Sequence, residues 1–388
     1  MIKMMFFPRH LRRHVLPAPV VLALAALAIP LVEPAAAGAT PPGSGDPTAP
    51  PTAHRLVPGQ DGLQAVDVPL DGSRGGDPAA PRLVKTATPF TMIGLTWARD
   101  RATREFRIQT RAEGRWSAWQ EIEPLADGPS TGEGSAVDGT DLTWVGAADA
   151  VRIKVAGARP DDLTAVLLAD DPTTAAPAER VVRPAARRGH KPPMRGRAQW
   201  GADPDLRTGT ATYNPTIQQV HVHHTVNSNS YTRDDVPGLL RGIYRYHTTS
   251  LGWSDIGYNF LIDRFGRTWV GRAGGPGKAV RGAHTLGFNH TSTGVAVIGT
   301  FEDRRPRRKV IAAIVRLSAW KLHRYGRKPQ GRVSVTSEGS DRYPAGTRPR
   351  LPTIDGHRDT NDTACPGTEL YAELPLIRRR TAARIARW

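Results

Sequence analysis

The feature that most constrains this chain of 388 residues is that it contains a single cysteine, Cys365. One cysteine cannot form an internal disulfide, so an apolar core has to hold the fold, and a hydrophobic content of 39% can supply one. The simplest interpretation of Cys365 is a small buried apolar side chain. The alternative is a metal ligand, because a bound metal would protect a lone thiol in an oxidising compartment.

The first 37 residues have the pattern of a secretory signal peptide. The stretch "MIKMMFFPRHLRRHV" is basic, "VVLALAALAIPLV" is apolar, and Ala35, Ala36 and Ala37 offer small residues for cleavage. The apolar run is short for a membrane span and contains a proline. We therefore expect a secreted, cell-wall-associated protein, attached to a membrane only if this segment stays uncleaved.

The chain is strongly basic, which favours acidic partners. Four basic residues and one acidic residue give residues 1–37 a net charge of +3, which leaves +14 of the formal +17 for the remainder. Nucleic acid and an anionic cell wall both fit this charge. Export favours the wall, and the sequence shows no recognition motif for nucleic acid. We therefore expect anionic wall polymers, and no nucleic acid, among the partners.

Composition and periodicity divide the rest of the chain into four segments. Residues 38–84 are rich in Pro, Gly, Ala and Asp and are predicted to be disordered. Residues 85–170 alternate apolar and polar positions between Gly and Asp turns, which predicts a small all-β, sandwich-like domain. Residues 171–195 form a Pro-Ala-Arg linker. Residues 196–388 alternate strands and helices, which predicts an α/β domain with a mixed central sheet and flanking helices.

Tryptophan is the conspicuous side chain of the predicted β domain, at Trp97, Trp116, Trp119 and Trp144. A tryptophan on a sandwich can stack on a sugar, but it can equally fill the core. The sequence leaves open whether this domain binds wall glycan or serves as a spacer or an interface.

Histidines gather in the α/β segment, most densely in the predicted strand "VHVHH". Side chains alternate along a strand, so His221 and His223 share one face and His224 points to the other. A second histidine, His357, and the single cysteine lie near the end of another predicted strand. Two imidazoles and one thiolate suit a catalytic zinc site whose fourth position is open. No HExxH motif is present, and one cysteine cannot form a PCxxC motif; a cysteine hydrolase remains an alternative without a family signature.

Five motifs occur in a fixed order: "VHVHHT", "GWSDIGYNFLID", "GRTWVGR", "RGAHTLGFNHTSTGVAVIGTF" and "GHRDTNDTACPG". Together with "RAQWGAD" at 197–203, they resemble the peptidoglycan-recognition protein and type-2 N-acetylmuramoyl-L-alanine amidase family, here as an exported bacterial member. The resemblance covers residues 196–388.

The resemblance implies a role for ten residues. The zinc ligands fall on His223, His357 and Cys365, and the catalytic positions fall on Tyr258 and Thr363. Positions of the groove that contact the stem peptide of the substrate fall on His224, His247, Trp253, His284 and Asn289. Each of these five can also be explained by local packing or hydrogen bonding.

The resemblance implies that the protein hydrolyses the amide bond between N-acetylmuramic acid and L-alanine in peptidoglycan and that it uses one Zn²⁺. It also implies that the protein is a monomer. Zinc lowers the pKa of a bound water to roughly 7. The alternative is a non-catalytic protein that binds peptidoglycan, against which the intact Cys365 argues. No buried glutamate stands out as a general base. A carbonyl or carboxylate is expected to accept the second N–H of each ligand histidine, and Asp359 is one candidate.

Overall fold

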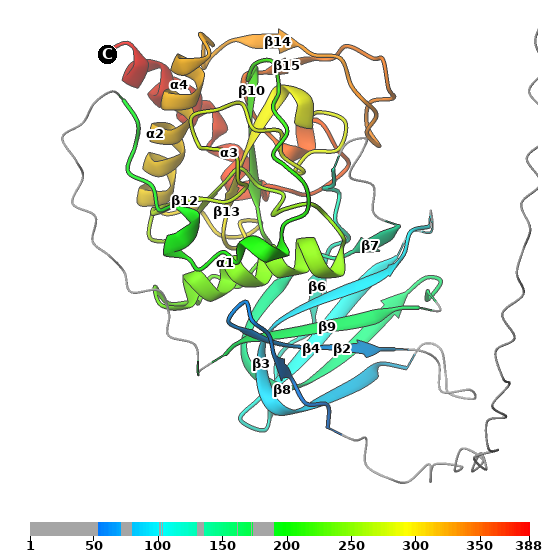
Figure 1. Ribbon diagram of the computed structural model, residues 1–388. Coiled ribbons are helices and arrows are strands. Elements are labelled where there is room, and N and C mark those ends of the chain that lie inside the picture. The colour runs from blue at the N-terminus through cyan, green and yellow to red at the C-terminus, as the bar shows by residue number, and fades with distance from the viewer. Residues whose placement is uncertain are drawn as a thin grey trace, which may run out of the picture. The chain divides into compact units, whose positions relative to one another are not determined.

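The computed structural model describes most of the chain after residue 52, and Figure 1 shows its arrangement. The described residues are 53–70, 80–100, 102, 104–129, 136–160, 162–171, 173 and 190–388. The predicted signal peptide at 1–37 and most of the predicted linker at 171–195 lie outside them. None of the helices in these residues combines the length and the apolar character needed to cross a membrane.

The N-terminal domain is all-β, as predicted. Its strands in the described residues form one nine-stranded sheet, in the order β1-β2-β9-β3-β8-β4-β5, with β6 beside β4 and β7 beside β3. Their bounds are β1 Val57–Pro58, β2 Leu63–Pro69, β3 Arg82–Ala98, β4 Glu105–Ala112, β5 Arg115–Trp116, β6 Gln120–Ile122, β7 Val137–Gly139, β8 Thr143–Ala156 and β9 Thr164–Asp170. Register shifts along β3 bend the sheet around a core that includes Phe90, Phe106 and Leu167.

The prediction of disorder over 38–84 is wrong for residues 53–70, and also for residues 82–84, where β3 begins. Strand β2 pairs with β9 along its whole length, from Leu63 opposite Asp170 to Pro69 opposite Thr164. Its sequence of seven residues, LQAVDVP, is short and gives little local signal, and the partner that orders it lies about a hundred residues further along the chain.

The tryptophans of this domain divide between core and surface. Trp97 is buried against Phe106, with ring centroids 4.9 Å apart. Trp119 is 39% exposed. Trp144 is half-buried and packs edge-on against Tyr231 of the second domain. The structure therefore supports a core and interface role for two of the four.

The C-terminal domain has the predicted mixed sheet, in the order β12-β11-β13-β10-β16. The strands are β10 Gln219–His224, β11 Phe260–Ile262, β12 Thr268–Val270, β13 Ser292–Val297 and β16 Ile354–Gly356, and a separate pair joins β14 Arg332–Ser334 to β15 Arg350–Pro352. Only β12 runs antiparallel to its neighbour within the five-stranded sheet. The helices are α1 Asp235–Arg245, α2 Arg308–Arg324, α3 Thr368–Ala372 and α4 Leu374–Ile385, and a π-helical turn, Tyr246–Ser250, follows α1.

The two faces of this sheet have different partners. Val220, Val222 and Val295 pack with α2 and α4, whereas Leu261 and Ala296 share a core with α1. The predicted linker ends earlier than expected, because Arg195 already pairs with the edge strand β12. The backbone N–H of Arg195 donates to the carbonyl oxygen of Thr268 at 2.8 Å.

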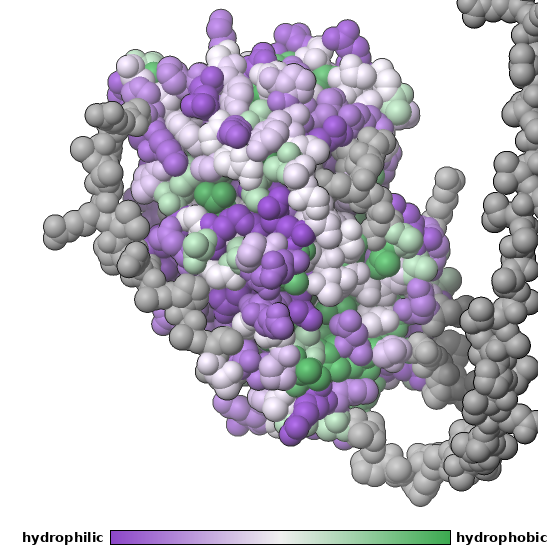
Figure 2. Space-filling model, in the orientation of Figure 1, coloured by the Kyte–Doolittle hydropathy of each residue, from purple (hydrophilic) through white to green (hydrophobic). Residues whose placement is uncertain are grey.

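Helix α1 also joins the two domains, which belong to one compact unit (Figure 1). Its apolar residues and those of the β domain, including Leu63, Met92 and Leu168, form one hydrophobic cluster. Gly242 lets the helix approach closely, since an added Cβ would lie 2.3 Å from Met92 Sδ. On the face drawn in Figure 2, hydrophobic residues gather over the β domain, and polar residues cover most of the α/β domain.

Candidate metal centre

Two adjacent parallel strands bring the predicted zinc ligands together. His223 lies near the end of β10, and His357 follows the last residue of β16, its neighbour in the sheet. Because the carboxyl ends of parallel strands meet at one edge, the two imidazoles converge there. The loop after His357 returns Cys365 to the same point, where Arg358 N–H donates to Cys365 O at 2.9 Å.

The three side chains fit a zinc ion. One ligand atom from each lies within 4.8 Å of the other two, and Cys365 Sγ is 3.8 Å from His223 Nδ1. Ligands about 2.0–2.3 Å from a tetrahedral centre are separated by roughly 3.5 Å, so a small inward movement completes the site. Within the described part of the chain, the Nε2 atom of His357 is buried without a hydrogen-bond partner, as expected of an atom that binds a metal.

The electrostatics of the site suit a cation. Burial lowers the pKa of His223 well below its usual value and that of His357 to about 3, so both rings are neutral and can donate a lone pair. Burial, with the charge of Asp127, raises the pKa of the Cys365 thiol well above its usual value. A dication at this point would favour the thiolate instead.

His284 orients His223. Its Nδ1 lies 3.2 Å from His223 Nε2, and Thr285 Oγ1 lies 3.4 Å from the same nitrogen. The ring of His284 rests on Gly294 of β13, where an added Cβ would come within 2.4 Å of it. The second nitrogen of His223 therefore faces an imidazole and a hydroxyl, and the predicted carbonyl or carboxylate partner is wrong for this ligand.

Asp359 does not support a ligand histidine. Its carboxylate accepts the N–H of Gly356 at 3.0 Å and the hydroxyl hydrogen of Tyr371 at 2.7 Å, so it holds the turn that begins at His357. The neighbouring buried pair, His221 Nδ1 and Asp355 Oδ1 at 2.8 Å, joins β10 to β16 beneath the site. The predicted shared face of His221 and His223 is confirmed, because both rings lie near His284, with centroids 6.0 and 5.1 Å away.

The two predicted catalytic residues occupy different places. The ring of Tyr258 lies 5.5 Å from that of His223, measured between centroids, and its hydroxyl donates to Asp127 beside the predicted ligands. The hydroxyl of Thr363 accepts the N–H of Cys365 at 3.2 Å, so this side chain fixes the cysteine loop.

Four of the five predicted substrate contacts lie on the metal-binding side. His247, Trp253 and Tyr258 form one aromatic group, with the His247 ring 4.4 Å from Trp253 and 6.0 Å from Tyr258. Asn289 accepts the N–H of His284 at 2.9 Å through Oδ1. His224 is turned to the opposite face, where its Nδ1 accepts the N–H of Phe301 at 3.4 Å, so its position does not support a substrate contact.

A carboxylate from the β domain, which the sequence did not indicate, lies beside the predicted metal ligands. Asp127 Oδ2 accepts the hydroxyl hydrogen of Tyr258 at 2.9 Å. Its Oδ1 lies 3.3 Å from His357 Nε2 and 3.9 Å from His223 Nδ1. Burial raises the pKa of Asp127 well above its usual value. No local pattern marks this residue, which lies in a loop of a different domain.

Comparison with known proteins gives the same two divisions of the chain. A family described as N-acetylmuramoyl-L-alanine amidase matches residues 213–368, and one described as Rv3811 N-terminal galactose-binding domain-like matches residues 47–185. Peptidoglycan-recognition protein SC1a of Drosophila melanogaster is 30% identical over 179 residues, which are 46% of this chain and 82% of that protein. Peptidoglycan recognition protein 1 of Mus musculus is 28% identical over 176 residues, 45% and 82% of the two chains. The solved structure of wild-type Drosophila PGRP-LB aligns with a TM-score of 0.37 and 26% identity, over 47% of this chain and 92% of that chain.

Proposed function

The chain belongs to the peptidoglycan-recognition protein and type-2 N-acetylmuramoyl-L-alanine amidase family. From that membership we propose that it hydrolyses the amide bond between N-acetylmuramic acid and L-alanine in peptidoglycan, using one zinc ion. The observation that carries the proposal is the convergence of His223, His357 and Cys365. A complete ligand set supports hydrolysis, because recognition alone does not require a buried thiol beside two neutral imidazoles.

The chain's own contribution is to prepare these ligands. Zinc bound here would supply Lewis acidity toward the scissile carbonyl and an activated water near neutral pH. Burial keeps both imidazoles neutral, and His284 and Thr285 fix the ring of His223 from behind. Thr363 holds the backbone of Cys365, so the thiol is positioned before substrate arrives.

Tyr258 is placed to stabilise the charge that develops on the carbonyl oxygen. Its hydroxyl donates to one oxygen of Asp127, and the other oxygen of that carboxylate faces the metal-binding nitrogens. A substrate carbonyl in the same position would receive the same hydrogen bond. A donor of this kind typically increases turnover roughly a hundred- to a thousand-fold.

The second candidate is a non-catalytic protein that binds peptidoglycan. The names of the relatives, which denote recognition, favour it. The two candidates differ in a single outcome, since only the enzyme releases stem peptide from the glycan.

We also propose that the protein is exported and acts at the cell wall. The predicted signal peptide at 1–37 and the formal net charge of +17 support this proposal. The N-terminal sequence of protein recovered from the culture medium tests it. A start after Ala37 is expected, and an uncleaved chain that stays inside the producing cells would contradict it.

The zinc dependence is tested with purified peptidoglycan. Protein depleted of metal by a chelator is compared with the same protein after zinc is restored, and soluble stem peptide is followed over time. Release only by the zinc-restored protein is expected. Equal release by both samples would show that hydrolysis does not require the metal. If neither sample releases peptide but both bind peptidoglycan, the second candidate is favoured.

A further inference from the structure

The proposed catalytic site is closed to solvent. His223 and Asn289 are fully buried, and Tyr258, His357 and Cys365 expose only 3%, 2% and 7% of their surface. An enzyme that cuts a polymer needs an open path to its metal, so a part of this molecule covers the site.

The cover comes from the β domain. It consists of residues 125–129, here called the capping segment. The segment begins where Leu125 N–H donates to Gly139 O at 2.8 Å, beside a bridge between Pro124 and Thr140. It reaches the α/β domain at Gly128, whose carbonyl accepts a hydrogen bond from Asn289 Nδ2 at 2.9 Å. A residue predicted to contact substrate is therefore already engaged by this chain.

Asp127 is the centre of the capping segment. Its side chain is 6% exposed and lies among Tyr258, His223 and His357. While Oδ2 is hydrogen-bonded to Tyr258, Oδ1 is buried without a hydrogen-bond partner in the described residues, 3.3 Å from an equally unpartnered His357 Nε2. Leaving such a carboxylate oxygen unsatisfied is costly, and a metal between the two atoms would satisfy both.

We propose that Asp127 is a fourth protein ligand of the metal, and that the capping segment thereby holds the enzyme in a closed, inactive state. The proposal rests on the zinc site proposed above. Oxygen and nitrogen ligands about 2.0–2.2 Å from a tetrahedral zinc are roughly 3.4 Å apart, and Asp127 Oδ1 lies 3.3 and 3.9 Å from the two nitrogens. The group whose ligand atoms all lie within 4.8 Å of one another comprises His223, His357 and Cys365, so binding by Asp127 as well requires its carboxylate to move closer to that group. Four protein ligands close a zinc site, whereas a catalytic site keeps one position open.

A role for Asp127 as proton acceptor fits the geometry less well. A general base has to leave room for the water that it deprotonates. The direct 3.3 Å approach of Oδ1 to His357 Nε2 leaves no such room, and the engagement of Asn289 by Gly128 occupies the groove as well.

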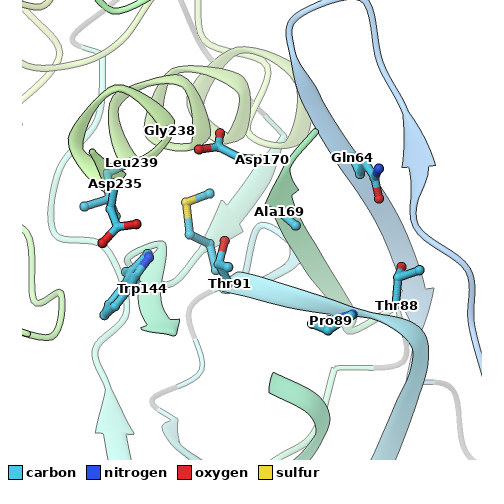
Figure 3. A pocket seen from close by; sticks show the side chains of 11 residues that line it. Gln64, Thr88, Pro89, Thr91, Trp144, Ala169, Asp170, Asp235, Gly238 and Leu239 are labelled. Atoms are coloured by element: carbon cyan, nitrogen blue, oxygen red, sulfur yellow. The ribbon is translucent and has the colours of Figure 1, made fainter. Parts of the chain in front are cut away.

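The contact between the domains is of a kind that can open. Besides the shared apolar cluster, the ion pairs that cross it in the described residues include Arg241 to Asp170 and Arg245 to Asp61, each at 2.7 Å. A pocket remains beside α1, between Gly238, Asp170 and Trp144 (Figure 3). Polar contacts and a pocket beside the apolar cluster leave room for relative domain motion, which is the default unless an interface is large and hydrophobic. The capping segment is rooted in the β sheet, so separation of the domains would withdraw it from the metal.

The test uses full-length protein loaded with cobalt, whose visible spectrum reports its ligands. Asp127→Ala and Asp127→Asn are compared with wild type and with Asp138→Ala, which removes a carboxylate from neighbouring β7 that pairs with Arg99 at the surface. Acetohydroxamate, a small metal-binding probe, is added to each. We expect the probe to change the spectrum of the two Asp127 variants at concentrations that leave wild type and Asp138→Ala unchanged. If the closed state is about 90–99% populated, hydrolysis of peptidoglycan should also rise about 10- to 100-fold in the Asp127 variants.

Each result that contradicts the proposal identifies the part of it that is wrong. An equal response of all four proteins to acetohydroxamate would overturn the ligand assignment. A fall in hydrolysis in both Asp127 variants, with unchanged spectra, would overturn the closed state and assign Asp127 to proton transfer. If none of the proteins hydrolyses peptidoglycan but only the Asp127 variants respond to the probe, the closed metal site is supported and the proposed amidase activity is the part that fails.

Discussion

The hydroxyl of Tyr258, in the α/β domain, donates a hydrogen bond of 2.9 Å to the carboxylate of Asp127, 131 residues earlier in the β domain. The bond joins the residue proposed to stabilise the transition state to the residue proposed to close the metal site. Under these two proposals the β domain would be more than a spacer, because it would decide whether the metal is accessible.

Replacing the cysteine tests the ligand set. Cys365→Ser is expected to lose zinc and to reduce hydrolysis to background, because a hydroxyl is a much poorer zinc ligand than a thiolate. The change is nearly isosteric at a buried position, so the fold should persist. Zinc content, circular dichroism and peptide release are measured on one preparation. Ser334→Ala, on exposed β14, provides the control. Stoichiometric zinc with full activity in Cys365→Ser would contradict the assignment.

Removing one hydroxyl tests the role of Tyr258. In the Asp127→Ala background, where the site is expected to be open, Tyr258→Phe should keep its zinc and lose roughly a hundred- to a thousand-fold in kcat, with little change in KM. Tyr325→Phe is the matched control, because that hydroxyl donates to Gly277 O far from the metal ligands. Near-normal turnover in Tyr258→Phe would leave the hydroxyl with a packing role only.

A larger side chain at the domain contact tests whether separation exposes the metal. Gly94 lies in β3, and an added Cβ would be 2.7 Å from the ring of Tyr246. Gly94→Val suits a strand but overpacks the contact, which typically costs about 1–3 kcal/mol. The variant should therefore melt at a lower temperature and yet respond to acetohydroxamate with Asp127 intact.

Gly196→Val is the control for that experiment. It adds the same atoms where the nearest neighbouring atom would be 4.0 Å away, so neither its melting temperature nor its response to the probe should change. A destabilised Gly94→Val protein that remains unresponsive would mean that the capping segment stays in place when the domains loosen.

The buried His247 predicts a pH dependence of stability. Burial, with the nearby charge of Arg272, lowers its pKa to about 3, whereas an unfolded histidine has a pKa of about 6.5. Between about pH 6 and pH 4 the unfolded state binds a proton that the folded state does not, so stability falls as the pH falls. This residue should account for about 1.4 kcal/mol per pH unit.

The variant His247→Asn isolates this effect. The amide oxygen can accept the N–H of Gly257, as Nδ1 of His247 does at 3.0 Å, but it does not titrate. The free energy of unfolding is measured by denaturant titration across this pH range. The free energy of unfolding of the variant is expected to change less steeply with pH than that of wild type. A constant loss of stability caused by the smaller side chain would not affect this comparison. Parallel slopes would show that His247 is not held neutral in the folded state.

The sequence predicted the residues whose positions follow from local patterns. Alternation along β10 placed His221 and His223 on one face, and the motif order placed His357 and Cys365 beside them. Strand β2 was missed because its stability comes from pairing with the distant β9. Asp127 was missed because its contacts come from a different domain. No sequence pattern near Asp127 predicts how the two domains pack.

The measurement that tests the central claim most directly is the mass of the products released from purified peptidoglycan by the zinc-loaded, full-length protein. If the protein is an N-acetylmuramoyl-L-alanine amidase, the soluble products are stem peptides with a free N-terminal L-alanine, and each lactyl group that loses its peptide is left on the glycan as a free carboxylic acid. The amount released should increase in Asp127→Ala and disappear in Cys365→Ser. Products cut within the peptide or between the sugars, or no product from any of these proteins, would contradict the account.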